Sequence, residues 1–311
     1  MNIIALAQRW SIGKVIHIER YPQGQHNQTY KVDAEKGMFS LRIYNYKKPP
    51  QINFEVSLLN VLKGLPVPQL VARSDGKYST KTGQKYAILY HFLPGGHLNH
   101  FTATQLQEVG RFIGQFHTRG QKFQWNKPRY QFYDLPDAKI RKFEFISRKN
   151  KVPHLEYLPT IIKELKENRL SSALPQGPIH VDIKPENTLF YREKMSGIID
   201  FDNSYIGPLL LDLAKSMVWF GTRNKRFHVN DALNIYYGYI QERKLTKEEH
   251  AQLYKAIKFA FLSHIFVDYY MRGMNKTSQE YFNFIVKDLY TAYQTFAMTE
   301  GEFYSLFSKK E

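Results

Sequence analysis

The sequence predicts an α+β fold in two lobes: a small antiparallel β-sheet lobe with one helix, and a larger lobe that is mostly helical. Short β-like runs separated by turn residues fill the first hundred residues. Apolar residues at helical intervals dominate after Thr102. The run Leu93-Pro94-Gly95-Gly96 breaks the first pattern. We therefore expect two domains, residues 1–92 and 93–311.

The first lobe is expected to contain five strands and one helix. Turn residues such as Glu35-Lys36-Gly37 separate the first strands, and Leu65-Pro66-Val67-Pro68 ends the helix. The expected strands are Lys14–Arg20, Thr29–Asp33, Met38–Tyr44, Gln69–Ala72 and Tyr86–Tyr90. The helix is expected over Ile52–Leu62, where apolar residues recur at helical intervals.

The second lobe begins with a helix start signal. Thr102 and Gln105 form a capping-box pattern, and Gly120 suits the end of the same helix. Thr246 and Glu249 form a second capping box. The further helices are expected as two within Asp134–Leu170, then Leu209–Phe220, Asp231–Glu242, Thr246–Met271 and a last one over most of Gln279–Phe307.

Composition excludes some classes of protein and favours others. The chain of 311 residues has no cysteine, which excludes disulfides and cysteine-based zinc or thiol chemistry. Its apolar start, Ile3–Ala7, is too short for a secretory core, and no stretch approaches a membrane span, so we expect a cytoplasmic protein. The net charge is +16, with 44 basic against 28 acidic residues, but the basic residues are scattered. We therefore do not expect a nucleic acid partner, and the charge would help to attract a polyanion such as ATP.

The stretch from His180 to Asp200 carries the strongest functional signal. Asp182 is followed by Asn187 five residues on, and by Asp200 thirteen residues further. This spacing is the one kinases use to activate a hydroxyl and to hold magnesium. Two β-like runs separate Asn187 from Asp200, and a hairpin there would return Asp200 to the loop. We expect Asp182 to act as the catalytic base, and Asn187 and Asp200 to bind Mg²⁺ through hard oxygen atoms.

Phosphate-binding residues are expected in the first lobe, which would bind the nucleotide. The loop with Gly24 and Asn27 lies between the first two strands, where backbone N–H groups can donate to phosphates. Arg42 on the third strand is the expected phosphate-clamping cation, and Glu55 on the next helix could pair with it. Lys184, two residues after Asp182, is a further candidate for the transferred phosphoryl group.

The chain resembles the aminoglycoside phosphotransferase/choline kinase superfamily, whose members are small-molecule kinases with a protein-kinase-like fold. The resemblance extends over nearly the whole length, and within the group it looks most like the kinase-fold homoserine kinases. It is carried by Gly24–Tyr30, Leu41–Tyr44, Leu65–Pro68, Ile179–Phe190, Ser196–Phe201 and Asp212-Leu213-Ala214. It implies ATP and Mg²⁺ as cofactors, a small-molecule hydroxyl acceptor, and the same roles for the residues named above.

The sequence identifies the acceptor less closely than it identifies the type of reaction. Homoserine or a similar amino alcohol is the first choice, with choline, methylthioribose and aminoglycosides as alternatives. Residues 202–205 follow Asp200-Phe201 where members of the family differ widely. A Ser/Thr protein kinase is a further alternative, although only a dozen residues separate Asp200 from Asp212, which leaves little room for a peptide platform. A non-catalytic nucleotide- or RNA-binding protein is the last. Asp212 itself is expected to be structural, supporting the catalytic loop.

Overall fold

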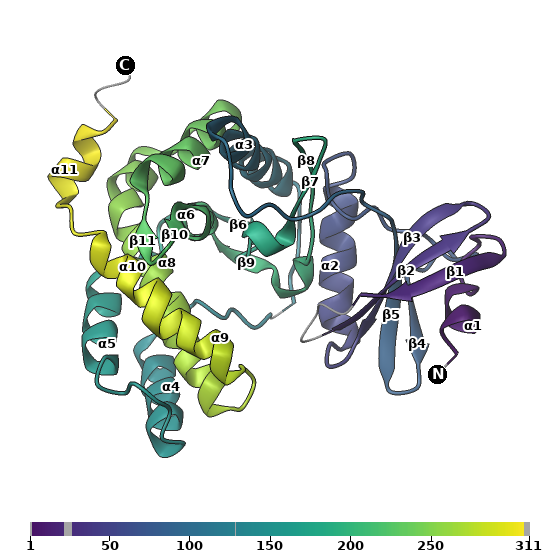
Figure 1. The fold of residues 1–311 in the computed structure, drawn as a ribbon, viewed down its shortest axis with the longest axis horizontal. Coiled ribbons are helices and arrows are strands. Elements are labelled where there is room, and N and C mark those ends of the chain that lie inside the picture. The colour runs from purple at the N-terminus through teal and green to yellow at the C-terminus, as the bar shows by residue number, and fades with distance from the viewer. Residues whose placement is uncertain (1, 22–26, 128, 308–311) are drawn as a thin grey trace. The chain divides into compact units, whose positions relative to one another are not determined.

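The computed structural model describes residues 2–21, 27–127 and 129–307, and the chain divides into two compact units (Figure 1). Unit 1 comprises residues 1–99, 119–128 and 186–204, and unit 2 comprises residues 100–118, 129–185 and 205–311. The predicted α+β class is confirmed, because an antiparallel sheet occupies the N-terminal part and helices fill the C-terminal part. The predicted domain boundary after residue 92 stays a prediction.

Unit 1 is built on a five-stranded antiparallel sheet with the strand order β1-β2-β3-β5-β4. The strands are β1 (Val15–Arg20), β2 (Asn27–Ala34), β3 (Gly37–Tyr44), β4 (Ser79–Thr82) and β5 (Lys85–His91). The expected strand Gln69–Ala72 does not form: Leu70 makes a single bridge to Tyr90. The edge position is taken instead by β4, a short polar strand.

The two faces of this sheet have different chemistry. Leu41 and Ile43 of β3 belong to an apolar cluster that includes Leu6 and Trp10 beside α1 (Ile3–Ala7). Helix α2 (Pro49–Val61) lies on the opposite side of the sheet (Figure 1). Because side chains alternate along a strand, Arg42 is directed away from the apolar cluster and toward α2. The sheet therefore presents a polar face to this helix.

A hairpin formed by β7 (Thr188–Tyr191) and β8 (Lys194–Ile198) completes unit 1, as the sequence predicts. Its two turn residues, Arg192 and Glu193, both have positive φ angles of 48° and 65°, which suits a tight hairpin turn. The backbone N–H of Ile199 donates to the carbonyl of Asn187 at 2.9 Å. The hairpin thus brings the residue before Asp200 back to Asn187.

Unit 2 is mostly helical. Its long helices are α3 (Ala103–Gly120), α4 (Asp137–Lys149), α5 (Leu158–Glu167), α6 (Leu209–Gly221), α7 (Val229–Glu242) and α8 (Lys247–Gly273). All of α6 is buried, and α8 contacts it and also α4 and α5 (Figure 1). Two small sheets pair β6 (Gln176–Ile179) with β9 (Tyr205–Pro208), and β10 (Thr222–Arg223) with β11 (Arg226–Phe227). Short 3-10 turns cover Pro185–Asn187 and Phe201–Asn203. In the first turn Pro185 belongs to unit 2 and the next two residues to unit 1, and the second turn belongs to unit 1.

The single helix expected over most of Gln279–Phe307 is wrong. The chain instead forms α9 (Gln279–Phe284), a π-helical turn (Ile285–Leu289), α10 (Tyr290–Thr295) and α11 (Glu300–Ser305). The break has a local cause, because Thr299 and Glu302 form a capping box that starts a new helix.

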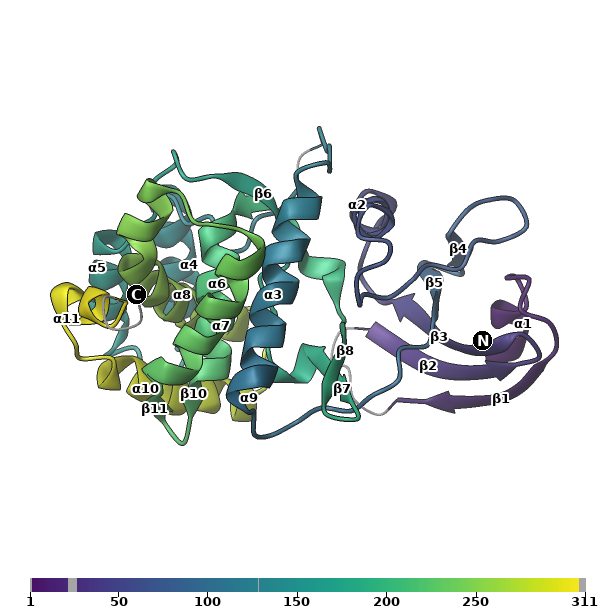
Figure 2. The same cartoon turned by 90° about the horizontal axis from the view of Figure 1, so that it is seen from above.

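Helices α3 and α7 lie side by side (Figure 2), and two glycines permit the close approach. A Cβ atom at Gly238 would lie 2.1 Å from the carbonyl oxygen of Gln107, and one at Gly110 would lie 2.0 Å from that of Ile235. Since α3 also carries His117, this packing sets the position of a side chain that contacts Asp212. Within the described part of the chain, no helix combines the length and apolar character needed to cross a membrane.

Candidate active site

The predicted catalytic loop, which begins at His180, is held by the carboxylate of Asp212 at the start of α6. The backbone N–H of His180 donates to Asp212 Oδ2 at 2.9 Å, and that of Val181 donates to Oδ1 at 2.6 Å. Val181 has a φ of 65°, which is rare for a β-branched residue. The two hydrogen bonds hold this turn in place, and the turn sets the direction in which Asp182 leaves it. The expected structural role of Asp212 agrees with these contacts.

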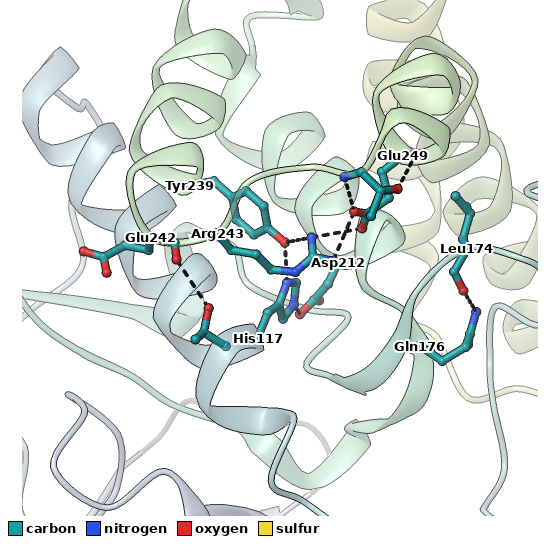
Figure 3. A network of polar contacts seen from close by, with 10 residues as sticks. His117, Leu174, Gln176, Asp212, Tyr239, Glu242, Arg243 and Glu249 are labelled. Carbon is teal, nitrogen blue, oxygen red and sulfur yellow. Dashed lines mark hydrogen bonds and ion pairs between the residues drawn. The ribbon is translucent and has the colours of Figure 1, made fainter.

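A chain of buried polar groups continues from Asp212 to the start of α8 (Figure 3). Its contacts join Asp212 Oδ2 to His117 Nε2 at 3.2 Å, His117 Nδ1 to the Tyr239 hydroxyl at 2.9 Å, and that hydroxyl to Arg243 Nη1 at 2.8 Å. Arg243 ends the chain with two bonds of 3.0 Å to Glu249.

In this series of hydrogen bonds, each group from Arg243 onward donates to the next one toward Asp212. A guanidinium can only donate, so the Tyr239 oxygen accepts from Arg243 and its hydroxyl donates to His117 Nδ1. His117 Nε2–H is then left to donate to Asp212. Burial lowers the pKa of His117, which favours this neutral imidazole. Burial alone would raise the pKa of Asp212, but the hydrogen bonds from His117 and from the His180 backbone lower it overall, so the loop rests on a carboxylate.

Asp182 lies next to a cation within unit 2. Its Oδ2 is 3.2 Å from Lys184 Nζ, and its side chain is 24% exposed, which leaves room for a substrate. Lys184 Nζ also lies over the ring of Trp219 on α6, 5.4 Å from the ring centre. A carboxylate that is partly exposed, positioned by a fixed loop and near a cation can accept a hydrogen bond from an alcohol.

Unit 1 gathers Arg42, Glu55 and Asp200. Arg42 Nη2 is 2.9 Å from Asp200 Oδ1, and Nη1 is 3.9 Å from Glu55 Oε1. Glu55 is buried and accepts hydrogen bonds of 2.8 Å from the hydroxyls of Tyr44 and Tyr90. Burial opposes the charge of Arg42, but Asp200 and the other acidic neighbours raise its pKa well above the usual value. A permanent cation therefore stands beside the predicted metal ligand.

The predicted metal ligands have the donor atoms that Mg²⁺ prefers. Asn187 offers an amide oxygen and Asp200 a carboxylate, and the backbone bond from Ile199 links their two segments. Asp200 has a φ of 74°, a left-handed conformation that Asp tolerates better than most residues. No group of three or more His, Cys, Asp or Glu side chains that could hold a metal occurs among the described residues. Two oxygen ligands suit Mg²⁺, which keeps waters and takes its other ligands from phosphates.

Asp202 lies in unit 1, two residues after Asp200, and no role was expected for it from the sequence. Asn27 Nδ2 donates to Asp202 Oδ2 at 2.9 Å, and Lys47 Nζ donates to the carbonyl of Asp202 at 3.0 Å and to Asn203 Oδ1 at 2.9 Å. The side chain of Asn27 thus contacts a carboxylate in this structure. In the sequence, residues 202–205 were singled out only as a stretch in which family members differ. Gly24, the other residue expected in that loop, lies outside the described residues.

Sequence reasoning missed a buried polar cluster in unit 2, formed by Tyr133, Lys215, His264 and Asp268. Lys215 Nζ is 3.4 Å from the ring centre of Tyr133 and 3.4 Å from His264 Nδ1. His264 Nε2 is 3.2 Å from Asp268 Oδ2. The signal that could have found the cluster is a lysine within the apolar run of α6, and an aspartate within the apolar part of α8.

Comparisons with known proteins identify the family of the chain and proteins with a similar fold. The family model described as "Phosphotransferase enzyme family" matches residues 17–250. The homoserine kinase of Beijerinckia indica is 28% identical over 251 residues, covering 78% of this chain and 77% of its own. The homoserine kinase of Rhizobium meliloti is 24% identical over 252 residues, covering 80% and 77%.

Solved structures show the same fold. An amicoumacin kinase in complex with AMP-PNP and Ca²⁺ matches with a TM-score of 0.71 at 15% identity, over 98% of this chain and 96% of that one. A spectinomycin phosphotransferase in complex with ADP matches with a TM-score of 0.65 at 17% identity, over 95% and 98%. At these identities the likeness concerns the fold. The family model, in contrast, extends over most of the sequence, and the chain therefore belongs to the phosphotransferase enzyme family.

Proposed function

We propose that the chain is a kinase that transfers the γ-phosphoryl group of ATP to the hydroxyl of a small molecule, with homoserine or a similar amino alcohol as the acceptor. The single observation that carries the reaction type is the position of Arg42 beside both Glu55 and Asp200. A fixed cation next to a metal-binding carboxylate is what phosphate binding requires. The choice of homoserine is supported by homoserine kinases that match about four fifths of the chain.

Unit 1 supplies the groups that act on the nucleotide. Arg42 donates from its planar guanidinium to phosphate oxygens, and Glu55 keeps that guanidinium oriented. Asn187 and Asp200 hold Mg²⁺. When bound, this ion neutralises the phosphates and holds them for an in-line displacement.

Unit 2 supplies the base. The acceptor hydroxyl donates its hydrogen bond to Asp182, whose direction is set by the Asp212 anchor. The hydroxyl oxygen forms a bond to the γ-phosphorus, while the bond from that phosphorus to the β,γ-bridging oxygen breaks. ADP leaves with the bonding electrons, and the hydroxyl proton passes to Asp182.

The first test replaces the base without changing its shape. Asp182→Asn is expected to bind ATP as the wild type does and to lower turnover by orders of magnitude, because the amide cannot take the proton. Turnover is measured as ADP release with homoserine, and nucleotide affinity by calorimetry. Asp75→Asn, an exposed carboxylate variant, serves as the matched control. Wild-type turnover in Asp182→Asn would refute the assignment of the base.

The second test concerns the acceptor. Purified protein with MgATP is offered homoserine, choline, methylthioribose and an aminoglycoside, with and without a chelator of divalent cations. We expect ADP release with homoserine that the chelator abolishes. A strong response to one of the other alcohols and none to homoserine would overturn the choice of acceptor and leave the kinase assignment in place.

A further inference from the structure

The buried cluster in unit 2 holds two opposite charges at the two ends of one imidazole ring. Lys215 on α6 is 2% exposed, and His264 and Asp268 on α8 are 6% and 7% exposed. Lys215 Nζ approaches His264 Nδ1 at 3.4 Å, and Asp268 Oδ2 approaches His264 Nε2 at 3.2 Å. Lys215 and Asp268 therefore do not rely on a direct ion pair with each other, because the ring lies between them.

The contacts assign the tautomer of this imidazole. A lysine ammonium has only donors, so Nδ1 accepts from it and the ring proton lies on Nε2, where it donates to Asp268. Burial and the charges of Lys215 and Lys184 hold the pKa of His264 well below the usual value, so the ring is neutral. A neutral ring hydrogen-bonds to both groups but supplies no opposite charge to either, and Asp268 Oδ1 also accepts from the Thr277 hydroxyl at 3.3 Å. When Lys215 and Asp268 are both ionised, one positive and one negative group face opposite ends of the ring.

An unbroken series of contacts joins the cluster to the base. Asp182 lies 3.2 Å from Lys184, whose ammonium lies over Trp219 at 5.4 Å. The Trp219 ring meets the His264 ring edge to face, with 4.8 Å between the ring centres. Asp182 is also the largest source of negative potential at Lys215. The cluster thus belongs to the surroundings of the hydroxyl that Asp182 would receive.

The charges of the cluster cost free energy in the absence of a ligand. Burial lowers the pKa of Lys215 to about 7 and raises the pKa of Asp268 to about 7, although their neighbours oppose both shifts. Buried ionisable groups that are not fully compensated are typical of functional sites. A ligand that carries a carboxylate and an ammonium would compensate both groups at once, whereas a purely cationic ligand would be repelled by Lys215.

We propose that Lys215 and Asp268 recognise the acceptor. Lys215 binds the carboxylate of the acceptor, and Asp268 binds the ammonium of the acceptor. This inference rests on the proposed function and narrows its acceptor to amino acids with a hydroxyl side chain. It disfavours choline and aminoglycosides, which are cations without a carboxylate. Tyr133 has a positioning role: its ring lies against Lys215 Nζ at 3.4 Å, and its hydroxyl contacts His264 Nδ1 at 3.1 Å.

The segment that carries Tyr133 is itself held in place. Lys139 Nζ donates to the backbone carbonyls of Gln131 and Asp134, the second at 2.8 Å. These bonds fix residues 131–134 against α4 without using the side chain of Tyr133. The tyrosine ring therefore reaches Lys215 from a braced loop, which favours a defined binding geometry.

The test removes one charge from the protein and the matching charge from the acceptor. The acceptors are L-homoserine, 3-aminopropan-1-ol, which lacks the carboxylate, and 4-hydroxybutyrate, which lacks the ammonium. The variants are Lys215→Met and Asp268→Asn, with Lys255→Met on the exposed side of α8 as the matched control. The readouts are kcat/KM from ADP release, and the midpoint of thermal unfolding.

We expect Lys215→Met to lower kcat/KM for homoserine by about 10- to 100-fold and to change that for 3-aminopropan-1-ol by less than about 3-fold, since a hydrogen bond to a charged group contributes about 1.5–3 kcal/mol. Asp268→Asn is expected to do the same for homoserine and to spare 4-hydroxybutyrate. The unfolding midpoint of Lys215→Met should change little, because Met keeps the apolar stem and His264 Nδ1 keeps a hydrogen-bond donor in the Tyr133 hydroxyl at 3.1 Å. Equal losses with every acceptor, or a large fall in the midpoint, would show a structural role and overturn the proposal.

A second measurement needs no variant. L-2-Aminobutyrate, propylamine and butyrate lack the hydroxyl and carry both charges, the ammonium alone, or the carboxylate alone. Tighter binding of L-2-aminobutyrate to the wild type, by at least about 10-fold, supports recognition of both charges. Equal affinities refute it while ADP release from homoserine still upholds the kinase assignment. Absence of ADP release with every alcohol refutes the proposed function itself.

Discussion

Replacing Asp212 by Asn tests how the catalytic loop is held. The carboxylate accepts three hydrogen bonds, from the backbone N–H groups of His180 and Val181 and from His117. An amide oxygen in place of Oδ2 keeps the bonds from His180 and His117. The amide nitrogen then takes the place of Oδ1, and its hydrogens meet the N–H of Val181, which is left buried without an acceptor.

The expected loss of stability follows from these contacts. A hydrogen bond to a charged group contributes about 1.5–3 kcal/mol, and a buried N–H without a partner costs about 1–3 kcal/mol. We therefore expect Asp212→Asn to lower the free energy of unfolding by about 2.5–6 kcal/mol, the sum of the two costs. Val181 stands in the left-handed region, which a β-branched residue leaves readily when its hydrogen bond is lost. Because Asp182 follows it directly, kcat should fall as well.

The effect also has a defined pH dependence. The pKa of Asp212 is lower in the folded protein than its ordinary value near 4, so the unfolded chain binds the proton more tightly. The contribution of Asp212 to stability is fully present above that ordinary value. It is lost as the pH falls through the folded pKa. The difference between wild type and Asp212→Asn should therefore shrink below about pH 4.

Urea unfolding at pH 7 measures the loss, and steady-state kinetics with homoserine measures kcat. Asp137→Asn is the control, because its carboxylate is half exposed and solvent screens its ion pair with Arg169. The reasoning fails if Asp212→Asn is as stable as the control variant and turns over substrate at the wild-type rate.

Three further predictions concern other parts of the molecule. Arg42→Lys should raise the KM for ATP about 10-fold, because lysine keeps the charge but loses the fork that contacts Asp200, and unchanged nucleotide kinetics would contradict this. Gly238→Ala should destabilise the protein by about 1–3 kcal/mol or more, because its Cβ would lie 2.1 Å from the Gln107 carbonyl; thermal unfolding equal to that of Gly301→Ala, where nothing lies near the Cβ, would argue against that packing. Saturating MgATP should raise the unfolding midpoint of the wild type but not after chelation of Mg²⁺, and an equal rise in both would show that the metal is not needed for binding.

The sequence predicts most of the fold because local patterns decide it. The strands of unit 1 alternate and end in turn residues, and capping boxes start α3 and α8 where expected. The edge strand β4 escaped prediction because Ser79–Thr82 is polar and short, and only its pairing with β5 makes it a strand. The last helix was predicted as continuous because its apolar pattern continues across the break that Thr299 introduces.

The residues of the candidate site also differ in how far the local sequence predicts them. Asp182, Asn187 and Asp200 are close in sequence, so their spacing is informative, and their roles stay predictions. The alternation of side chains along β3 was enough to predict that Arg42 lies on the face of the sheet opposite Leu41 and Ile43. The pair Lys215 and Asp268, in contrast, comes from two helices more than fifty residues apart in the chain. Only tertiary packing brings it together, and no local spacing encodes it.

The discontinuity of unit 1 has a consequence for synthesis on the ribosome. Phe54 on α2 packs against Phe123 and Trp125, and the carbonyl of Pro66 accepts a bond from Ile198 in the hairpin that completes the unit. Phe123 and Trp125 follow residue 99 by 24 and 26 residues, whereas Ile198 follows it by 99 residues. At the usual rate of about 5–20 residues per second, roughly a hundred more residues take about 5–20 seconds. During that time the nascent N-terminal unit lacks the hairpin that completes it, so we expect chaperones to engage the unfinished chain before its hairpin arrives.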